Sequence, residues 1–156
     1  MANYRSIHTK FWTDHKVEPL SKEGKLLFLY LMTNSHRSSS GLYPITRNRA
    51  ARDCSMKDEE VDEALAELAE AGLVLYDDET STVLIINAVK YLPKSKEMRK
   101  SVVNDLIFNN SPLADELLRA HPCIRQWEEW TEEAQSILGS RSGKKEWDDG
   151  DNDIPF

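Results

Sequence analysis

Residues 148–156 combine carboxylates with a short apolar end, and this pairing of side chains could bind another protein. The ring of Phe156, and the α-carboxylate that we expect on the same residue, would need an apolar pocket with an Arg or Lys at its rim. Pro155 restricts its own φ and favours an extended Ile154, which lowers the entropy lost on binding. The carboxylates would attract a basic surface in a salt-sensitive way. The predicted docking residues are Asp148, Asp149, Asp151, Asp153, Ile154, Pro155 and Phe156.

The same residues resemble a known docking tail. The sequence Asp-Asn-Asp-Ile-Pro-Phe at 151–156 resembles the tail of bacterial single-stranded-DNA-binding proteins, which end in a run of Asp followed by Ile-Pro-Phe or Leu-Pro-Phe. The resemblance covers the last ten residues, and Gly150 and Asn152 interrupt the acidic run. It implies that the tail recruits host replication and repair proteins. The alternative is an acidic tail that only keeps the chain soluble, because runs of charge are often simply solvated.

Two stretches of the chain carry the basic side chains that could hold phosphate. The stretch from His36 to Arg52 has no acidic residue, and the stretch from Lys90 to Lys100 has only Glu97. Lys and Arg that neutralise phosphates supply most of the affinity for nucleic acid. The predicted DNA-binding residues are Arg37, Arg47, Arg49, Arg52, Lys90, Lys94, Lys96, Arg99 and Lys100.

Aromatic and basic residues alternate in the stretch from Tyr4 to Trp12, a composition that suits bases stacked on rings beside a phosphate track. For Phe11 and Trp12 we instead expect packing under the first helix, since large aromatic side chains are usually buried.

Composition indicates one domain with an appendage and excludes several classes of protein. Residues 1–100 hold 15 basic and 15 acidic residues, and residues 101–156 hold 5 and 12, so the net charge of −7 belongs to the C-terminal part. The N-terminal part is therefore free to bind nucleic acid. Cys54 and Cys123 lie far apart, so we expect no disulfide and no zinc site, but two buried thiols in a reducing cytoplasm. No stretch has membrane-spanning length.

The sequence shows no arrangement of residues that is typical of an enzyme active site. No Gly-rich phosphate-binding loop is present, and the spacing of His8 and His15 matches no metal site. The carboxylates are too evenly distributed to single out an acid and a base. We therefore expect no enzyme, no metal and no cofactor.

The elements that would position these residues follow from caps and periodicity. Ser21 caps a helix through residues 26–32 that is apolar on all sides and that we therefore expect to be central and buried. Thr46 caps a brief helix over 47–53. Between these helices, the apolar residues 42–45, which include Pro44, are typical of a short edge strand. Ser55 with Asp58 predicts a capping-box start for a longer helix that ends at Gly72. The apolar runs at 73–76 and 83–86 predict a hairpin.

This order of elements is similar to the winged helix-turn-helix domains of phage replication proteins and DnaD-type replisome organisers. The similarity covers about residues 4–92 and lies in Phe11-Trp12, the run from Leu20 to Leu31, and the segment from Ala64 to Leu73. It implies an α+β fold, mainly α, with a small β-hairpin. We expect a winged-helix domain at 1–92, a helical extension at 93–138, a flexible linker at 139–147 and the acidic tail at 148–156.

The second helix of the expected helix-turn-helix is acidic, although this helix normally enters the major groove. Its exposed face would carry Glu59, Asp62, Glu63, Glu67 and Glu70, and the expected hairpin tip at 77–79 is acidic as well. Such a surface repels phosphate. Either DNA is held elsewhere or this helix contacts a protein.

Beyond the hairpin, we expect helices over 95–108 and from Ser111 to His121, followed by a helical stretch with Trp127 and Trp130. These helices pack either on the winged helix or against a second copy of the chain. Glu residues surround the two tryptophans, which favours a core or homodimer role over base stacking.

The sequence predicts a non-enzymatic DNA-binding protein of phage or mobile-element replication, in a bacterial or phage-infected cytoplasm. Its tail would bring host proteins to DNA, single-stranded or duplex. One alternative is a single-strand-binding protein on a winged-helix fold, whose DNA binding would tighten once the tail is removed. Another is a decoy that binds no DNA and occupies the tail pocket of host proteins.

Overall fold

The computed structural model describes residues 4–139, and the predicted docking tail lies outside the described residues. Helices predominate and accompany a small antiparallel sheet, which confirms the expected mainly α, α+β class. The elements are, in chain order, η1 (Thr9–Thr13), α1 (Lys22–Thr33), β1 (Leu42–Pro44), α2 (Arg47–Cys54), α3 (Asp58–Glu70), β2 (Val74–Asp77), β3 (Thr82–Ile85), η2 (Val89–Tyr91), α4 (Lys96–Phe108), α5 (Leu113–Ala120), η3 (Pro122–Gln126) and α6 (Glu132–Leu138).

The sheet has the strand order β1-β3-β2, so β3 is central and β1 lies at an edge, as the sequence predicts. Leu84 of β3 pairs with Leu42 on one side and with Leu75 on the other. Successive side chains of a strand point to opposite faces, so Leu84 faces one side of the sheet and Val83 and Ile85 face the other. All four residues of β3 are buried, which means that both faces of the sheet are covered.

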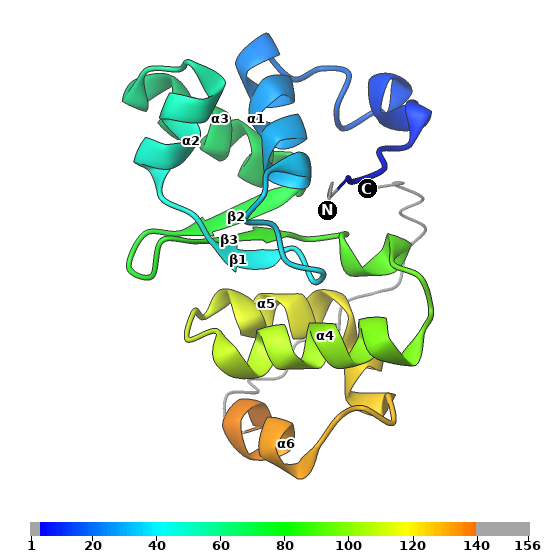
Figure 1. Cartoon of the computed structure of the whole chain (residues 1–156). Helices are drawn as coiled ribbons and strands as arrows, with labels where there is room; N and C mark the ends of the chain where they lie inside the picture. Colours follow the sequence, from blue (N-terminus) through cyan, green and yellow to red (C-terminus); the bar gives the residue numbers. More distant parts are fainter. Residues whose placement is uncertain (1–3, 140–156) are drawn as a thin grey trace.

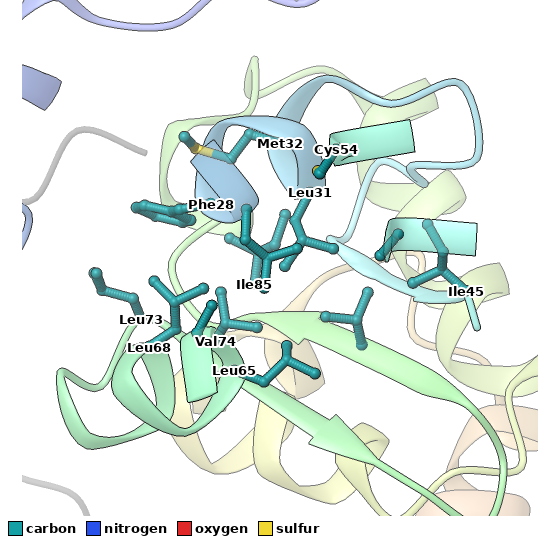
Figure 2. Packing of buried hydrophobic residues seen from close by; sticks show 14 of the residues in the cluster. Phe28, Leu31, Met32, Ile45, Cys54, Leu65, Leu68, Leu73, Val74 and Ile85 are labelled. Atoms are coloured by element: carbon teal, nitrogen blue, oxygen red, sulfur yellow. The ribbon is translucent and has the colours of Figure 1, made fainter. Parts of the chain in front are cut away.

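Helices α1, α2 and α3 cover the first face of the sheet (Figure 1). Phe28 and Leu31 of α1 and Leu68 of α3 converge on Val74 and Ile85 of the sheet, as Figure 2 shows. The inward residues of α3 recur at the three- and four-residue spacing of an amphipathic helix. Burial of these side chains makes the N-terminal elements and the sheet one core.

The second face is covered by the C-terminal helices. Leu84 belongs to a separate cluster with Val102 and Leu106 of α4, Leu117 of α5 and Leu138 of α6. Figure 1 shows α4 and α5 below the sheet and α6 beyond them. Of the two arrangements expected for these helices, the structure therefore has packing on the N-terminal elements.

Two polar contacts tie the ends of α5 to the hairpin. At the start of this helix, Ser111 Oγ donates to Asp77 Oδ2 at 3.0 Å. Beyond its end, the His121 ring lies with Nε2 2.7 Å from the carbonyl oxygen of Ile86. The hairpin is thus held by side chains from the helical extension as well as by its own ladder.

Four of the described helices begin at hydroxyl caps, two of which, Ser21 and Thr46, the sequence predicts. Ser21, Thr46 and Ser95 each accept a hydrogen bond from the backbone N–H three residues later, at 3.0, 3.1 and 3.2 Å. Each bond satisfies an N–H group that has no partner within its helix. The starts of α1 and α2 are therefore confirmed.

The expected capping box at Ser55 and Asp58 is wrong. Ser55 has a φ of 54° and ends α2 in the left-handed conformation, because the chain must reverse before α3 begins. Lys57 precedes α3 instead, and its backbone N–H donates to Glu60 Oε1 at 3.2 Å.

Two expectations of burial are also wrong. Leu26 of α1 is 46% exposed, because α2, α3 and the sheet do not surround this helix completely. Cys123 is exposed as well, whereas Cys54 is buried, and both thiols are free.

Candidate nucleic-acid interface

Arg37 lies in the loop after α1, and its guanidinium is largely buried. Its Nη1 donates to the carbonyl oxygen of Met32 at 2.8 Å, and Nε is buried without a hydrogen-bond partner in the described part of the chain. Burial lowers the pKa of the Arg37 guanidinium, and the nearby charge of Arg5 lowers it further. Arg5 in turn donates from Nη2 to the Arg37 carbonyl at 2.8 Å. Arg37 therefore stabilises the start of the 37–41 loop.

Arg47 is occupied by contacts from two other elements. Its Nη1 contacts the Asp62 carboxylate of α3. Nη2 and Nε lie 2.7 and 2.9 Å from Asp78 Oδ1 in the turn of the hairpin. The guanidinium also lies 4.9 Å from the centre of the Tyr76 ring. Arg47 thus connects α2, α3 and the hairpin, and its charge is already balanced by two carboxylates.

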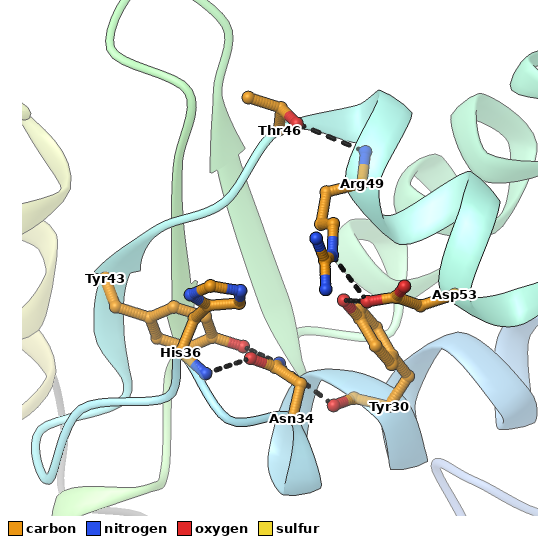
Figure 3. A network of polar contacts seen from close by, with 7 residues as sticks. All are labelled: Tyr30, Asn34, His36, Tyr43, Thr46, Arg49 and Asp53. Atoms are coloured by element: carbon orange, nitrogen blue, oxygen red, sulfur yellow. Dashed lines mark hydrogen bonds and ion pairs between the residues drawn. The ribbon is translucent and has the colours of Figure 1, made fainter.

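Arg49 is paired within its own helix (Figure 3). Its Nε donates to Asp53 Oδ2 at 2.9 Å, and the Tyr30 hydroxyl donates to the same oxygen at 2.6 Å. The Tyr30 hydroxyl and Arg49 together lower the pKa of Asp53. Arg52 is exposed and makes no ion pair with the residues that the structure describes.

A second polar group in Figure 3 orders the chain after α1. Asn34 Nδ2 donates to the Tyr43 hydroxyl at 2.7 Å, and that hydroxyl donates to the Leu31 carbonyl at 2.6 Å. Asn34 Oδ1 accepts from the backbone N–H of His36 at 2.9 Å. Burial raises the pKa of Tyr43, so the phenol stays neutral and serves as a structural donor.

The predicted acidic face of α3 is present, but Glu67 does not belong to it. Glu67 does not point into solvent: its carboxylate accepts from the backbone N–H and the hydroxyl of Ser21, at 2.5 and 2.7 Å. It caps α1, which places an anion at the positive end of that helix. Glu59, Glu63 and Glu70 remain exposed, and the hairpin turn is exposed at residues 78–80.

The second basic stretch surrounds η2 and the start of α4. Lys90, Lys94, Lys96 and Lys100 are exposed. No carboxylate among residues 4–139 forms an ion pair with Lys94, Lys96 or Lys100. Arg99 is half-buried, with its guanidinium 5.6 Å from the centre of the Trp127 ring. The lysines of this stretch are exposed, whereas Arg37 is largely buried and Arg47 and Arg49 are paired with carboxylates.

The 37–41 loop connects this stretch to the N-terminal residues. The hydroxyl of Ser101 in α4 donates a hydrogen bond to the hydroxyl of Ser39 in the loop at 3.2 Å. The backbone N–H of Ser40 donates to Asp105 Oδ2 at 3.1 Å. Gly41 has a φ of 76°, and a Cβ there would lie 2.5 Å from the Ala88 side chain. Since Arg5 binds the same loop, the N-terminal residues, η2 and α4 all adjoin it.

Exposed aromatic rings accompany the cations. Phe11 is fully buried, as expected, in an edge contact with Trp12, but Trp12 is 60% exposed and does not pack under α1. Tyr4 is 88% exposed beside Arg5, and Tyr91 is 40% exposed with Lys90 Nζ 5.8 Å from its ring centre. The sequence interpretation missed Tyr91, whose signal was an aromatic residue directly after Lys90 in a basic run.

Other chemistry has less support in the described residues. Within residues 4–139, no group of three His, Cys, Asp or Glu side chains could hold a metal ion. Burial raises the pKa of the Cys54 thiol to about 11, so it stays protonated and unreactive at neutral pH. In the same part of the chain, no helix is both long and apolar enough to cross a membrane.

Comparison with known proteins identified no relative: no family model, no curated protein and no solved structure matches the chain.

Proposed function

We propose that this protein is a non-enzymatic DNA-binding protein of phage or mobile-element replication that brings a host protein to DNA through its C-terminal tail. The observation that carries the DNA-binding part is a set of exposed lysines next to Lys90 and Arg99, namely Lys94, Lys96 and Lys100, which pair with no carboxylate among residues 4–139. A cation that already pairs with a carboxylate neutralises a phosphate less fully, so it displaces fewer of the counterions that are condensed on DNA. Lysines without such a partner among the described residues are therefore the better phosphate contacts. Among the predicted DNA-binding residues, we therefore favour those at 90–100 over those at 37–52.

We also propose that residues 1–92 are a winged helix-turn-helix domain. In support, α1, the edge strand β1, the pair α2 and α3, and the hairpin β2–β3 follow in the order of that fold. The acidic surface of α3 and of the hairpin turn makes the usual major-groove contact unfavourable. In this proposal the domain supplies the scaffold, and the basic stretch at 90–100 supplies the contact with DNA.

The DNA-binding part is tested by charge removal with a matched control. Lys96→Gln with Lys100→Gln removes two of the unpaired charges, and Lys22→Gln with Lys57→Gln removes two exposed charges elsewhere. Both variants have the same net charge, and Lys96 and Lys22 each stand at the first residue of a helix. Binding of a labelled oligonucleotide is measured by fluorescence anisotropy from 50 to 200 mM salt.

We expect the first variant to bind more weakly at low salt and to reduce the slope of log K against log salt by about 0.7 to 0.9 for each lost contact. The control should keep the slope of the unmodified protein. Equal changes in both variants would show that only net charge matters and would remove 90–100 from the interface. Absence of DNA binding at 50 mM salt would leave the decoy alternative.

The recruiting part rests on the sequence of residues 148–156, which lie outside the described residues. Deletion of Phe156 should abolish binding of bacterial proteins that take up single-strand-binding-protein tails, because the aromatic ring that would fill the apolar pocket is lost. Asp148→Asn with Asp149→Asn should mainly slow association and weaken its salt dependence. Recovery of the same host proteins with and without Phe156 would contradict the docking role.

A further inference from the structure

We infer that the basic stretch at 90–100 binds single-stranded rather than duplex DNA, an inference that rests on the proposed function and specifies its ligand. The first observation is the neighbourhood of Tyr91. Its ring is 40% exposed at the end of η2, lies beside Lys90, and is followed within nine residues by Lys94, Lys96 and Lys100. An exposed ring beside phosphate-binding cations is the arrangement on which an unpaired base stacks.

A second exposed ring adjoins the same surface from another part of the chain. Tyr4 is 88% exposed, and its neighbour Arg5 is held against the 37–41 loop by the Arg37 carbonyl. That loop also contacts α4 through Ser101. Arg5, which follows Tyr4, and Ser101 of α4 therefore contact the same loop.

The spacing of the lysines suits a flexible strand. Lys96 and Lys100 stand four residues apart on α4, about 6 Å along the helix axis and on one side of it. Arg99 extends this side over the Trp127 ring. Lys96 and Lys100 thus form a short row along α4, and Tyr91 precedes Lys96 by five residues in the chain.

Duplex DNA fits the same surface poorly. Paired bases offer no free face to Tyr91, so the ring would add nothing to duplex binding. The elements that would reach into a major groove carry exposed Glu59, Glu63 and Glu70 on α3 and acidic residues in the hairpin turn. A duplex read by these elements would meet carboxylates, whereas a single strand needs only the cations and the ring of η2 and α4.

The test compares a labelled single-stranded 20-mer of mixed sequence with its matched duplex at 50 mM salt, using the full chain and fluorescence anisotropy. We expect the single strand to bind at least about tenfold more tightly. Tyr91→Ala should weaken single-strand binding by about five- to tenfold, the lower part of the range for loss of one stacked base, and should leave duplex binding unchanged. Tyr91→Phe should retain the affinity, because the ring and not the hydroxyl stacks.

Phe108→Ala is the matched control. Phe108 is 82% exposed at the far end of α4, about 18 Å along the axis from Lys96, so its loss should change neither affinity. Urea unfolding of each variant separates loss of the ring from loss of the fold.

The outcomes separate this inference from the proposed function. Equal or tighter binding of the duplex would overturn the inference alone, and so would a Tyr91→Ala variant that binds the single strand normally or loses both ligands equally. Absence of binding to both ligands would overturn the proposed DNA-binding function and the inference with it.

Discussion

Replacement of Arg47 by Met tests whether this side chain stabilises the fold or contacts DNA. The substitution keeps a long apolar stem and removes the contacts of the guanidinium with Asp62, Asp78 and the Tyr76 ring. Both carboxylate side chains are more than half exposed, at 57% and 72%, so each ion pair stabilises the protein by only about 0.5 kcal/mol. The cation–π contact adds about 0.5 to 1 kcal/mol. Arg47→Met should therefore lower the free energy of unfolding by about 1.5 to 2 kcal/mol.

Urea denaturation followed by circular dichroism measures this loss. With a typical dependence of about 1 to 3 kcal/mol per molar urea, the midpoint should fall by about 1 M. At 1 M NaCl the Debye length is about 3 Å, so the ion-pair part should shrink while the cation–π part stays. Arg52→Met is the control: Arg52 is exposed and has no ion pair among the described residues, so its loss should stay within about 0.5 kcal/mol.

Two results would refute this reasoning. Equal midpoints for Arg47→Met and Arg52→Met would show that the contacts of Arg47 do not stabilise the fold. A lower salt dependence of DNA binding in Arg47→Met, by about 0.7 to 0.9 in slope, would show that Arg47 leaves its carboxylates for phosphate. Residues 37–52 would then again be assigned to the DNA-binding surface.

Three further predictions follow from burial and protonation. Leu84 is fully buried at the centre of the sheet, so Leu84→Ala should lower the free energy of unfolding in urea by about 2 to 5 kcal/mol; a loss below 1 kcal/mol would contradict its packing. Cys123 is exposed and Cys54 is buried with a pKa raised to about 11, so Ellman's reagent at pH 8 should react quickly with one thiol and with the second only in urea. The hydrogen bond from Thr80, followed by that from Ser111, lowers the pKa of Asp77 below its ordinary 3.8. Since the folded pKa is the lower one, this stabilisation is complete above about pH 5 and is lost as the pH falls through the folded pKa. Asp77→Asn should destabilise the protein at pH 7, and the difference in urea midpoint should shrink as the pH falls through the folded pKa of Asp77. A difference that stays constant with pH would contradict this.

Local signals in the sequence predicted most of the elements. A hydroxyl before an apolar run determines where a helix begins, and Ser21, Thr46 and Ser95 cap their helices through bonds to residues three positions away. Hydrophobic periodicity likewise identified the buried face of α3 and the two strands of the hairpin. The failure at Ser55 has a local cause as well. A capping-box pattern there competes with the turn that ends α2, and the turn decides the conformation.

Contacts between residues that are far apart in the sequence could not be predicted from local sequence patterns. Glu67 appeared exposed because its neighbours on α3 are, yet it binds Ser21, 46 residues earlier. Arg47 appeared unpaired because no acidic residue lies near it in the sequence, yet the fold brings Asp62 and Asp78 to it. Charge runs in a sequence therefore overestimate the charge that is available for a ligand, and only the fold shows which cations are already paired.

Coverage of both sheet faces bears on how this protein could hold DNA. A hairpin with one free face can lie along a duplex, but here α1–α3 occupy one face and α4 and α5 the other. The turn of the hairpin is its most exposed part, and it carries Asp78 and Glu79, of which Asp78 binds Arg47. The packing that makes the helical extension part of the core thus removes the hairpin as a binding surface. The same packing leaves the start of α4 exposed after η2, and in our proposal a strand of DNA meets Lys96 and Lys100 there, two cations without a carboxylate partner in the described part of the chain.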